Sequence, residues 1–141
     1  MCNDMTLDQE SIKKGIYFAR PMKFTERNES DMVMADPFTG EVKKRAQSIY
    51  PNGSTLTTAG GLVFTAFMDG SLAAYDDTSL DQVWKINVGT GFNAPPMTFE
   101  AGGKQYIAIL SGISNLSKGR LVLTPELRDQ RNQTSLFFFG L

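Results

Sequence analysis

The sequence predicts an all-β protein, and three observations support that prediction. Short segments rich in apolar, β-branched or aromatic residues recur along the chain. Residue types that favour tight turns separate these segments, as in Asp36-Pro37 and Asp69-Gly70. Helical periodicity is weak, and the one helix we expect is a short one over Leu7–Lys14. We therefore expect strands joined by short antiparallel connections.

Nine segments have the length and composition of strands. In chain order they are Ile16–Ala19, Met32–Ala35, Leu62–Phe67, Ser71–Tyr75, Gln82–Ile86, Met97–Glu100, Gln105–Leu110, Leu121–Thr124 and Ser135–Leu141. Asp69-Gly70 lies between two of them and is a strong hairpin signal, because both turn positions tolerate a positive φ. The basic run Lys43–Arg45 is expected on the solvent-facing side of a further strand.

The turn signals recur at a nearly fixed spacing. Asp36 and Asp76 each follow an apolar run and lie 40 residues apart. Gly60-Gly61 recurs 42 residues later as Gly102-Gly103. A period of this length with about four strands per unit is typical of a propeller blade. The predicted fold class is all-β, a partial β-propeller of two to three four-stranded antiparallel blades.

Length and composition restrict the possible functions. The 141 residues include no histidine and one cysteine, which excludes His-based triads, thiolate zinc clusters and an internal disulfide. A net charge of -1 gives no electrostatic signature of nucleic-acid binding, and no apolar stretch is long enough to span a membrane. The first residues lack the basic and apolar regions of a signal peptide, which by itself favours a cytoplasmic product.

The chain is short for a closed propeller. At 40–42 residues per blade it holds about three blades at most, whereas closed propellers have about four to eight. An incomplete ring leaves strand edges and apolar faces uncovered. We therefore expect the chain to associate with further propeller blades or with another copy of itself.

Two copies of a short motif lie 40 residues apart. The positions that fit the motif are Asp36, Thr39 and Gly40 in the first copy and Ala74, Asp76 and Trp84 in the second. Lys44 stands in the first copy where the second has Trp84. This pattern resembles the repeat Ala-x-Asp-x-x-Thr-Gly-x-x-x-Trp of the pyrroloquinoline-quinone (PQQ)-dependent alcohol and methanol dehydrogenases.

Longer stretches extend this resemblance. Residues 55–65, 89–99 and 103–112 are similar to the last blades of those dehydrogenases, and residues 135–141 are similar to their closing strand. We accordingly divide the chain into a poorly matched N-terminal segment, residues 1–29, and incomplete quinoprotein-like repeats with a C-terminal closing strand, residues 30–141.

Within these repeats, most of the residues that fit the motif have a structural interpretation. An aspartate before a turn accepts bonds from nearby backbone N–H groups, so Asp36 and Asp76 are expected to cap turns. The alternative, a calcium site, would need six or more converging oxygens. The resemblance implies that Trp84 docks flat against backbone of the neighbouring blade, with cofactor stacking as the alternative.

The resemblance also implies a function. Members of the family oxidise an alcohol at calcium-bound PQQ in the periplasm and pass electrons to a cytochrome c. Their catalytic base, calcium ligands and vicinal disulfide lie on earlier blades, so we expect no catalytic or metal-binding residue in this chain. One contact carries over: the backbone of Asn52 and Gly53 matches a position that meets the cofactor, where relatives commonly have tryptophan. A plain turn is the alternative for Asn52.

Two functional hypotheses remain. The chain is either the C-terminal fragment of a PQQ-dependent alcohol dehydrogenase, inactive alone, or a non-catalytic quinoprotein-like scaffold that binds a protein partner. Lys44 and Asn52, which replace tryptophans of the family pattern, suit the second hypothesis.

Overall fold

The computed structural model describes residues 3–4, 9–15, 23–24, 30–48, 50, 52–112, 125–127 and 134–141. Their elements are β1 (Asn3–Asp4), α1 (Gln9–Lys13), β2 (Lys23–Phe24), β3 (Ser30–Ala35), β4 (Val42–Ser48), β5 (Asn52–Thr57), β6 (Leu62–Phe67), β7 (Ser71–Asp76), β8 (Gln82–Asn87), β9 (Met97–Ala101), β10 (Lys104–Ser111), the 3-10 turn Pro125–Leu127, and β11 (Ser135–Gly140). The described part of the chain is thus built almost entirely of strands, as predicted.

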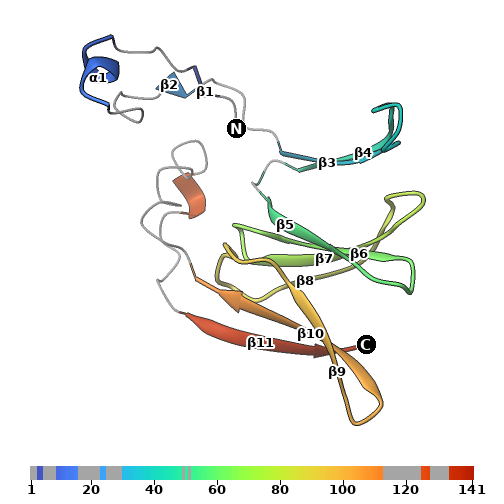
Figure 1. Ribbon diagram of the computed structural model, residues 1–141. Coiled ribbons are helices and arrows are strands. Elements are labelled where there is room, and N and C mark those ends of the chain that lie inside the picture. Colours follow the sequence, from blue (N-terminus) through green and yellow to red (C-terminus); the bar gives the residue numbers. More distant parts are fainter. Residues whose placement is uncertain are drawn as a thin grey trace.

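The strands form successive antiparallel sheets. We call them the first sheet (β3-β4), the middle sheet (β5-β6-β7-β8) and the last sheet (β11-β10-β9); a further short pair joins β1 to β2. Figure 1 shows the three sheets fanned out in chain order. This arrangement confirms the prediction of a partial β-propeller.

The first sheet repeats the outer half of the middle sheet with an offset of 40 residues. Met34 pairs with Lys44, and the register then shifts before the next pair; Ala74 pairs with Trp84, and the register shifts at the same place. A register shift of this kind marks a β-bulge, which bends and twists a strand. The shared register shift shows that β3 and β4 correspond to β7 and β8. Among the described residues, only the middle sheet has all four strands of the repeat unit.

The sheets are held together by apolar side chains between them. Met32 of the first sheet packs with Val63 and Leu80. On its other face, the middle sheet packs against the last sheet through a cluster that contains Phe64 and Ile107. A second cluster joins the same two sheets; it consists of Ala66, Leu72, Phe92 and Ile109, with Val88, Phe137 and Phe139 against it.

Most of the predicted strands are present, and the differences have a physical reason. The expected strands at residues 16–19 and 121–124 lie outside the described residues, and α1 is shorter than the expected helix. β4 and β5 were absent from the nine predicted segments, although a strand was expected around Lys43–Arg45. Both are poor in large apolar residues, because neither strand lies at the centre of a sheet.

No helix among the described residues is long and apolar enough to cross a membrane.

Candidate functional site

The two repeat turns have the same hydrogen bonds. Asp36 Oδ1 accepts from the N–H groups of Phe38 and Thr39 at 2.8 and 3.0 Å. Asp76 Oδ1 accepts in the same way from the two equivalent residues of its own turn at 2.9 and 2.8 Å. The structure therefore contains the turn caps that the sequence predicted. Thr39 adds a second cap, because its Oγ1 accepts from the N–H of Glu41 at 3.3 Å.

These hydrogen bonds also stabilise the ionised carboxylates. Bonds from the backbone N–H groups of Thr39 and Phe38, and then a bond from Lys43, hold the pKa of Asp36 below its ordinary value. The Lys43 Nζ lies 3.2 Å from Asp36 Oδ2. Backbone bonds lower the pKa of Asp76 for the same reason. The described residues contain no group of three or more His, Cys, Asp or Glu side chains that could hold a metal ion.

Trp84 contacts the last sheet through an aromatic ring. Its ring lies 5.9 Å from the ring of Phe139 at an interplanar angle of 71°, so the contact is edge-to-face. Trp84 is 39% exposed, and its flat docking on backbone of the neighbouring blade stays a prediction. Ala74, its cross-strand partner, is buried and contributes to the cluster with Phe64 and Ile107.

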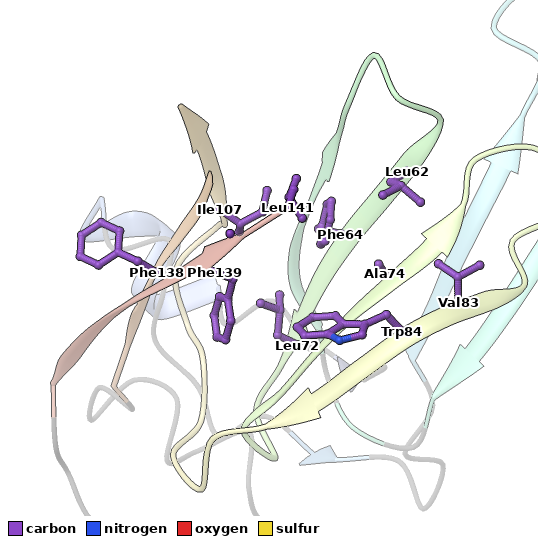
Figure 2. Close-up of a pocket in the computed structure, with 11 residues that line it drawn as sticks. Leu62, Phe64, Leu72, Ala74, Val83, Trp84, Ile107, Phe138, Phe139 and Leu141 are labelled. Atoms are coloured by element: carbon purple, nitrogen blue, oxygen red, sulfur yellow. The ribbon is translucent and has the colours of Figure 1, made fainter. Parts of the chain in front are cut away.

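An apolar groove lies beside Trp84, between the middle and last sheets. It has a volume of about 480 Å³, and its lining residues are Leu62, Phe64, Leu72, Ala74, Val83, Trp84, Ile107, Phe138, Phe139, Gly140 and Leu141. Figure 2 shows the Phe139 ring close to Leu72 and Trp84, whereas Phe138 points from the opposite side of β11. No lining side chain carries a charge, so the groove favours apolar contacts.

The predicted cofactor contact lies at one end of the middle sheet. Asn52, the first residue of β5, pairs with Phe67, and the register shifts between Asn52 and Thr55. Gly53 therefore lies within a bulge, a feature that is frequent next to active sites. The backbone geometry is compatible with a special role for these two residues, and their contact with a cofactor stays a prediction.

A network of hydrogen bonds organises the same end of the sheet. Asp69 accepts from both the N–H and the hydroxyl of Ser71, each at 2.9 Å. Asn87 donates from Nδ2 to the Asp69 carbonyl oxygen at 2.9 Å and to Ser71 Oγ at 3.2 Å. Asn87 Oδ1 in turn accepts from the N–H of Gly89 at 2.8 Å. The hairpin turn between β6 and β7 is thus tied to the chain that leaves β8.

That chain then crosses to the last sheet along a fixed path. The N–H of Phe92 donates to the Phe67 carbonyl oxygen at 3.1 Å, and the N–H of Gly112 donates to the Gly91 carbonyl oxygen at 2.9 Å. Thr90, which directly precedes Gly91, is buried, and its hydroxyl has no hydrogen-bond partner among the described residues. Such groups are rare in folded proteins, which makes Thr90 the least satisfied polar side chain described here.

Tyr50 brings a distant segment to this end of the sheet. It packs with Met68 and Leu127, the last residue of the 3-10 turn. Burial raises the pKa of the Tyr50 phenol, and the nearby carboxylates of Glu126 and Asp69 raise it further. The charged groups that act on Tyr50 are thus two carboxylates, those of Glu126 and Asp69.

The groups described at this end of the sheet fit only part of what a PQQ ligand requires. PQQ carries three carboxylates, and a site for it needs cationic or multiple N–H donors. The side chains described around the Asn52 end supply the carboxylates of Asp69 and Glu126, which repel such a ligand. The donors predicted for such a ligand are the backbone N–H groups at the Asn52–Gly53 bulge.

Sequence reasoning missed Tyr50, Asn87 and Phe139. Asn87 stands two residues before a glycine, a pattern that is typical of an Asn side chain bonding to the backbone. That pattern is a signal that could have revealed its role. The contacts of Tyr50 with Glu126 and of Trp84 with Phe139 join residues far apart in the sequence, and no local pattern indicates them.

Comparisons with known proteins agree with this geometry. A family model described as "PQQ: Glucose/ethanol/alcohol dehydrogenase, beta-propeller domain" matches residues 17–107, well over half of the chain. Lupanine 17-hydroxylase [cytochrome c] of a Pseudomonas species is 37% identical over 106 residues, which cover 74% of this chain and 15% of that protein. Methanol dehydrogenase [cytochrome c] subunit 1 of Paracoccus denitrificans is 35% identical over 95 residues, covering 66% of this chain and 15% of the relative.

The fold has a counterpart among solved structures. The quinohemoprotein alcohol dehydrogenase of Comamonas testosteroni aligns with a TM-score of 0.67 over 89% of this chain and 18% of that one. Its sequence identity is 23%, so this likeness concerns the fold alone. The chain spans less than a fifth of the length of each of these three proteins.

Proposed function

The chain belongs to the PQQ-type glucose/ethanol/alcohol dehydrogenase family of β-propeller domains, and from this membership we propose that it forms the C-terminal part of the propeller of a PQQ-dependent alcohol dehydrogenase. The parent enzyme oxidises an alcohol, with PQQ as the redox cofactor. The chain supplies one complete blade, parts of the two blades beside it and no catalytic residue.

One observation carries the proposal. The middle sheet is a complete four-stranded unit, whereas the first sheet contains the outer two strands of such a unit and the last sheet contains three. Repeat units bury their apolar faces by stacking on neighbours, so a run of this kind is stable within a longer array. The small share of each relative that the chain covers supports the same conclusion.

The cofactor and partners of the parent follow from the family. PQQ supplies the redox chemistry when bound, together with calcium, and these residues contribute part of the surrounding wall. The backbone of Asn52 and Gly53 is the proposed contact. We assign the rest of the PQQ site to other blades, because the carboxylates of Asp69 and Glu126 near Tyr50 would repel this anionic ligand. A cytochrome c as electron acceptor and a periplasmic location are part of this proposal.

A non-catalytic scaffold is the second candidate. The observation that favours it is Lys44, which occupies in the first sheet the place that Trp84 occupies in the middle sheet. A lysine cannot provide the aromatic surface that tryptophan gives to the repeat. Its presence suits a propeller that does not need to hold a cofactor. In this case the parent protein binds a protein partner and no PQQ.

An antiserum against this chain tests the proposal on extracts of the source cells. We expect it to detect a polypeptide several times larger than 15.6 kDa that co-migrates, in a native gel, with dye-linked alcohol oxidation dependent on PQQ and calcium. The isolated chain, supplied with PQQ and calcium, should show no turnover.

Three outcomes contradict parts of this proposal. A product of 15.6 kDa alone excludes the larger enzyme. A large polypeptide that stays inactive after addition of PQQ and calcium indicates the scaffold. Turnover by the isolated chain shows that the active site lies within these residues.

A further inference from the structure

The turn between β6 and β7 is covered by the end of β8 and the chain that follows it. Three carbonyl oxygens of this turn accept hydrogen bonds from that segment: Phe67 from the N–H of Phe92 at 3.1 Å, Gly70 from the N–H of Val88 at 2.9 Å, and Asp69 from Asn87 Nδ2 at 2.9 Å. Two of these donors are backbone groups, so the bond from Asn87 is the one of the three that a side-chain substitution removes.

Gly70 allows the two segments to approach so closely. A Cβ on this residue would lie 3.0 Å from the backbone N and O of Thr90 and 3.2 Å from Asn87 Oδ1. Thr90 is buried, and its contact with Gly70 is made by its backbone. Residues 67–71 and 87–92 therefore form one packed unit, which we call the clamp.

Phe67 connects the clamp to β5. Its carbonyl oxygen accepts from the N–H groups of both Gly70, at 3.2 Å, and Phe92, so both of its lone pairs are used within the clamp. Phe67 is also the partner of Asn52 in the register of β5 and β6. Because its carbonyl group faces away from β5, Phe67 and Asn52 form the closer type of antiparallel pair, with Cα atoms about 4.5 Å apart. A shift of Phe67 therefore moves Asn52.

The same pairing sets the direction of the Asn52 backbone. In a pair of this type, the N–H group of each residue points away from the strand of the other. The Asn52 N–H is thus directed to the side of β5 on which no described strand pairs. This N–H belongs to the backbone contact that the proposed function assigns to the cofactor.

We propose that Asn87 is a positioning residue for this contact: its side chain closes the clamp, and the clamp fixes Phe67 and thereby the direction of the Asn52 N–H. The inference rests on the proposed function, which supplies the cofactor. Within the sheet, β6 and β7 lie between Asn87 and β5, so the effect of Asn87 passes through the clamp.

The chemistry of the clamp requires an amide side chain at this position. Asn87 Nδ2 donates to the Asp69 carbonyl oxygen and to Ser71 Oγ, while Oδ1 accepts from the N–H of Gly89. A carboxylate would keep the acceptor and lose the donor. Asn87→Asp therefore separates the bond that closes the clamp from the bond to Gly89.

The test compares Asn87→Ala and Asn87→Asp with a control at the opposite end of the same sheet. Ser79 Oγ accepts from the N–H of Asp81 at 3.2 Å in the turn between β7 and β8, and Ser79→Ala removes this bond. Asn87 is exposed, so its truncation leaves no cavity. We expect Asn87→Ala and Ser79→Ala to lower Tm by similar amounts, about 5 °C or less.

The first readout is the position of the Asn52 and Gly53 amide signals in the NMR spectrum of the 141-residue chain. Both Asn87 variants should shift these signals, and Ser79→Ala should leave them in place. Unchanged signals in Asn87→Ala, or equal shifts in Ser79→Ala, overturn the positioning role. Wild-type signals in Asn87→Asp also overturn it, because the bond to Gly89 would then be sufficient.

The second readout is the affinity of the full-length parent apoprotein for PQQ, followed by the quenching of its tryptophan fluorescence. Asn87→Ala should weaken binding by about tenfold, the loss expected when one preformed hydrogen bond is displaced, and Ser79→Ala by less than about twofold. Unchanged affinity in Asn87→Ala overturns the role toward the cofactor.

The two readouts separate this inference from the proposed function. A parent protein that binds PQQ with unchanged affinity in the Asn87 variants overturns the inference alone. A parent protein that binds no PQQ overturns the proposed function and, with it, the cofactor contact. In that case the amide signals alone decide whether Asn87 positions Asn52.

Discussion

Gly40 and Leu80 occupy the same position in two turns, and both have left-handed backbone, with φ of 73° and 57°. The N–H of each donates to the carbonyl oxygen of the aspartate four residues earlier, at 2.8 and 2.9 Å. Glycine adopts this conformation without strain, whereas a leucine there costs about 1–2 kcal/mol. Leu80 is only 8% exposed and packs with Met32 and Val63, so burial offsets the strain.

This balance predicts an unusual order of stability for two Leu80 variants. Leu80→Ala loses the buried side chain but keeps the strained backbone, and we expect a loss of about 2–3 kcal/mol in the free energy of unfolding. Leu80→Gly loses the same contacts but relieves the strain, so it should be as stable as Leu80→Ala or up to about 1 kcal/mol more stable. Urea unfolding measures both.

The control is the same pair of substitutions at Lys85, an exposed residue of β8. Glycine is normally the less stable choice within a strand, so Lys85→Gly should unfold at lower urea than Lys85→Ala. If Leu80→Gly is also clearly the weaker of its pair, the left-handed backbone at Leu80 contributes no strain.

Gly70 and Gly40 should respond differently to alanine. Both have positive φ, but a Cβ on Gly70 would lie 3.0 Å from the backbone N and O of Thr90, whereas a Cβ on Gly40 meets nothing within 4 Å. Gly40→Ala should therefore cost about 1 kcal/mol from strain alone. Gly70→Ala also displaces the chain between β8 and β9 and should cost at least about 1 kcal/mol more. Equal midpoints in thermal unfolding would contradict the close approach.

The two turn aspartates predict a loss of stability in acid. Backbone hydrogen bonds hold the pKa of Asp36 and of Asp76 below the ordinary value, so the unfolded state binds protons more readily than the folded state. The stabilisation is complete above the unfolded pKa and disappears as pH falls through the depressed folded pKa. The double variant Asp36→Asn, Asp76→Asn should flatten the dependence of urea midpoints on pH in this acidic range. Glu100→Gln, at an exposed position of β9, is the control and should keep the wild-type slope.

Local chemistry explains why the repeat was predictable from the sequence. The caps at Asp36 and Asp76 involve bonds to residues two and three positions away, so the spacing in the sequence reports them directly. The same holds for the hairpin at Asp69-Gly70. The all-β class followed from these turns and from the strongly apolar strands β6 and β7, which are buried in the middle sheet.

Long-range packing explains what the sequence did not reveal. Tyr50 and Glu126 are brought together by the fold, and neither has a local pattern that indicates the contact. The surroundings of Trp84 depend on the neighbouring sheet, because its ring contact is with Phe139 of β11, 55 residues further along the chain. β5 was missed because its Asn-Gly-Ser-Thr run has the composition of a turn, although it pairs along β6.

Phe139 and Phe138 offer a sharp comparison at the groove. Phe139 packs in both clusters between the middle and last sheets and contacts Trp84, whereas Phe138 lies on the other side of β11 and is 59% exposed. Phe139→Ala should lower the free energy of unfolding by roughly 2–4 kcal/mol and shift Trp84 emission to longer wavelength, because the indole loses its one aromatic contact among the described residues.

Phe138→Ala removes a similar ring from the exposed face, so its cost should stay below about 1 kcal/mol and the emission of Trp84 should change little. Urea unfolding followed by tryptophan fluorescence reports both quantities in one experiment. If the two variants shift the emission equally, the edge-to-face contact does not determine the surroundings of Trp84. In that case the middle and last sheets are held together mainly by the buried clusters around Ile107 and Ile109.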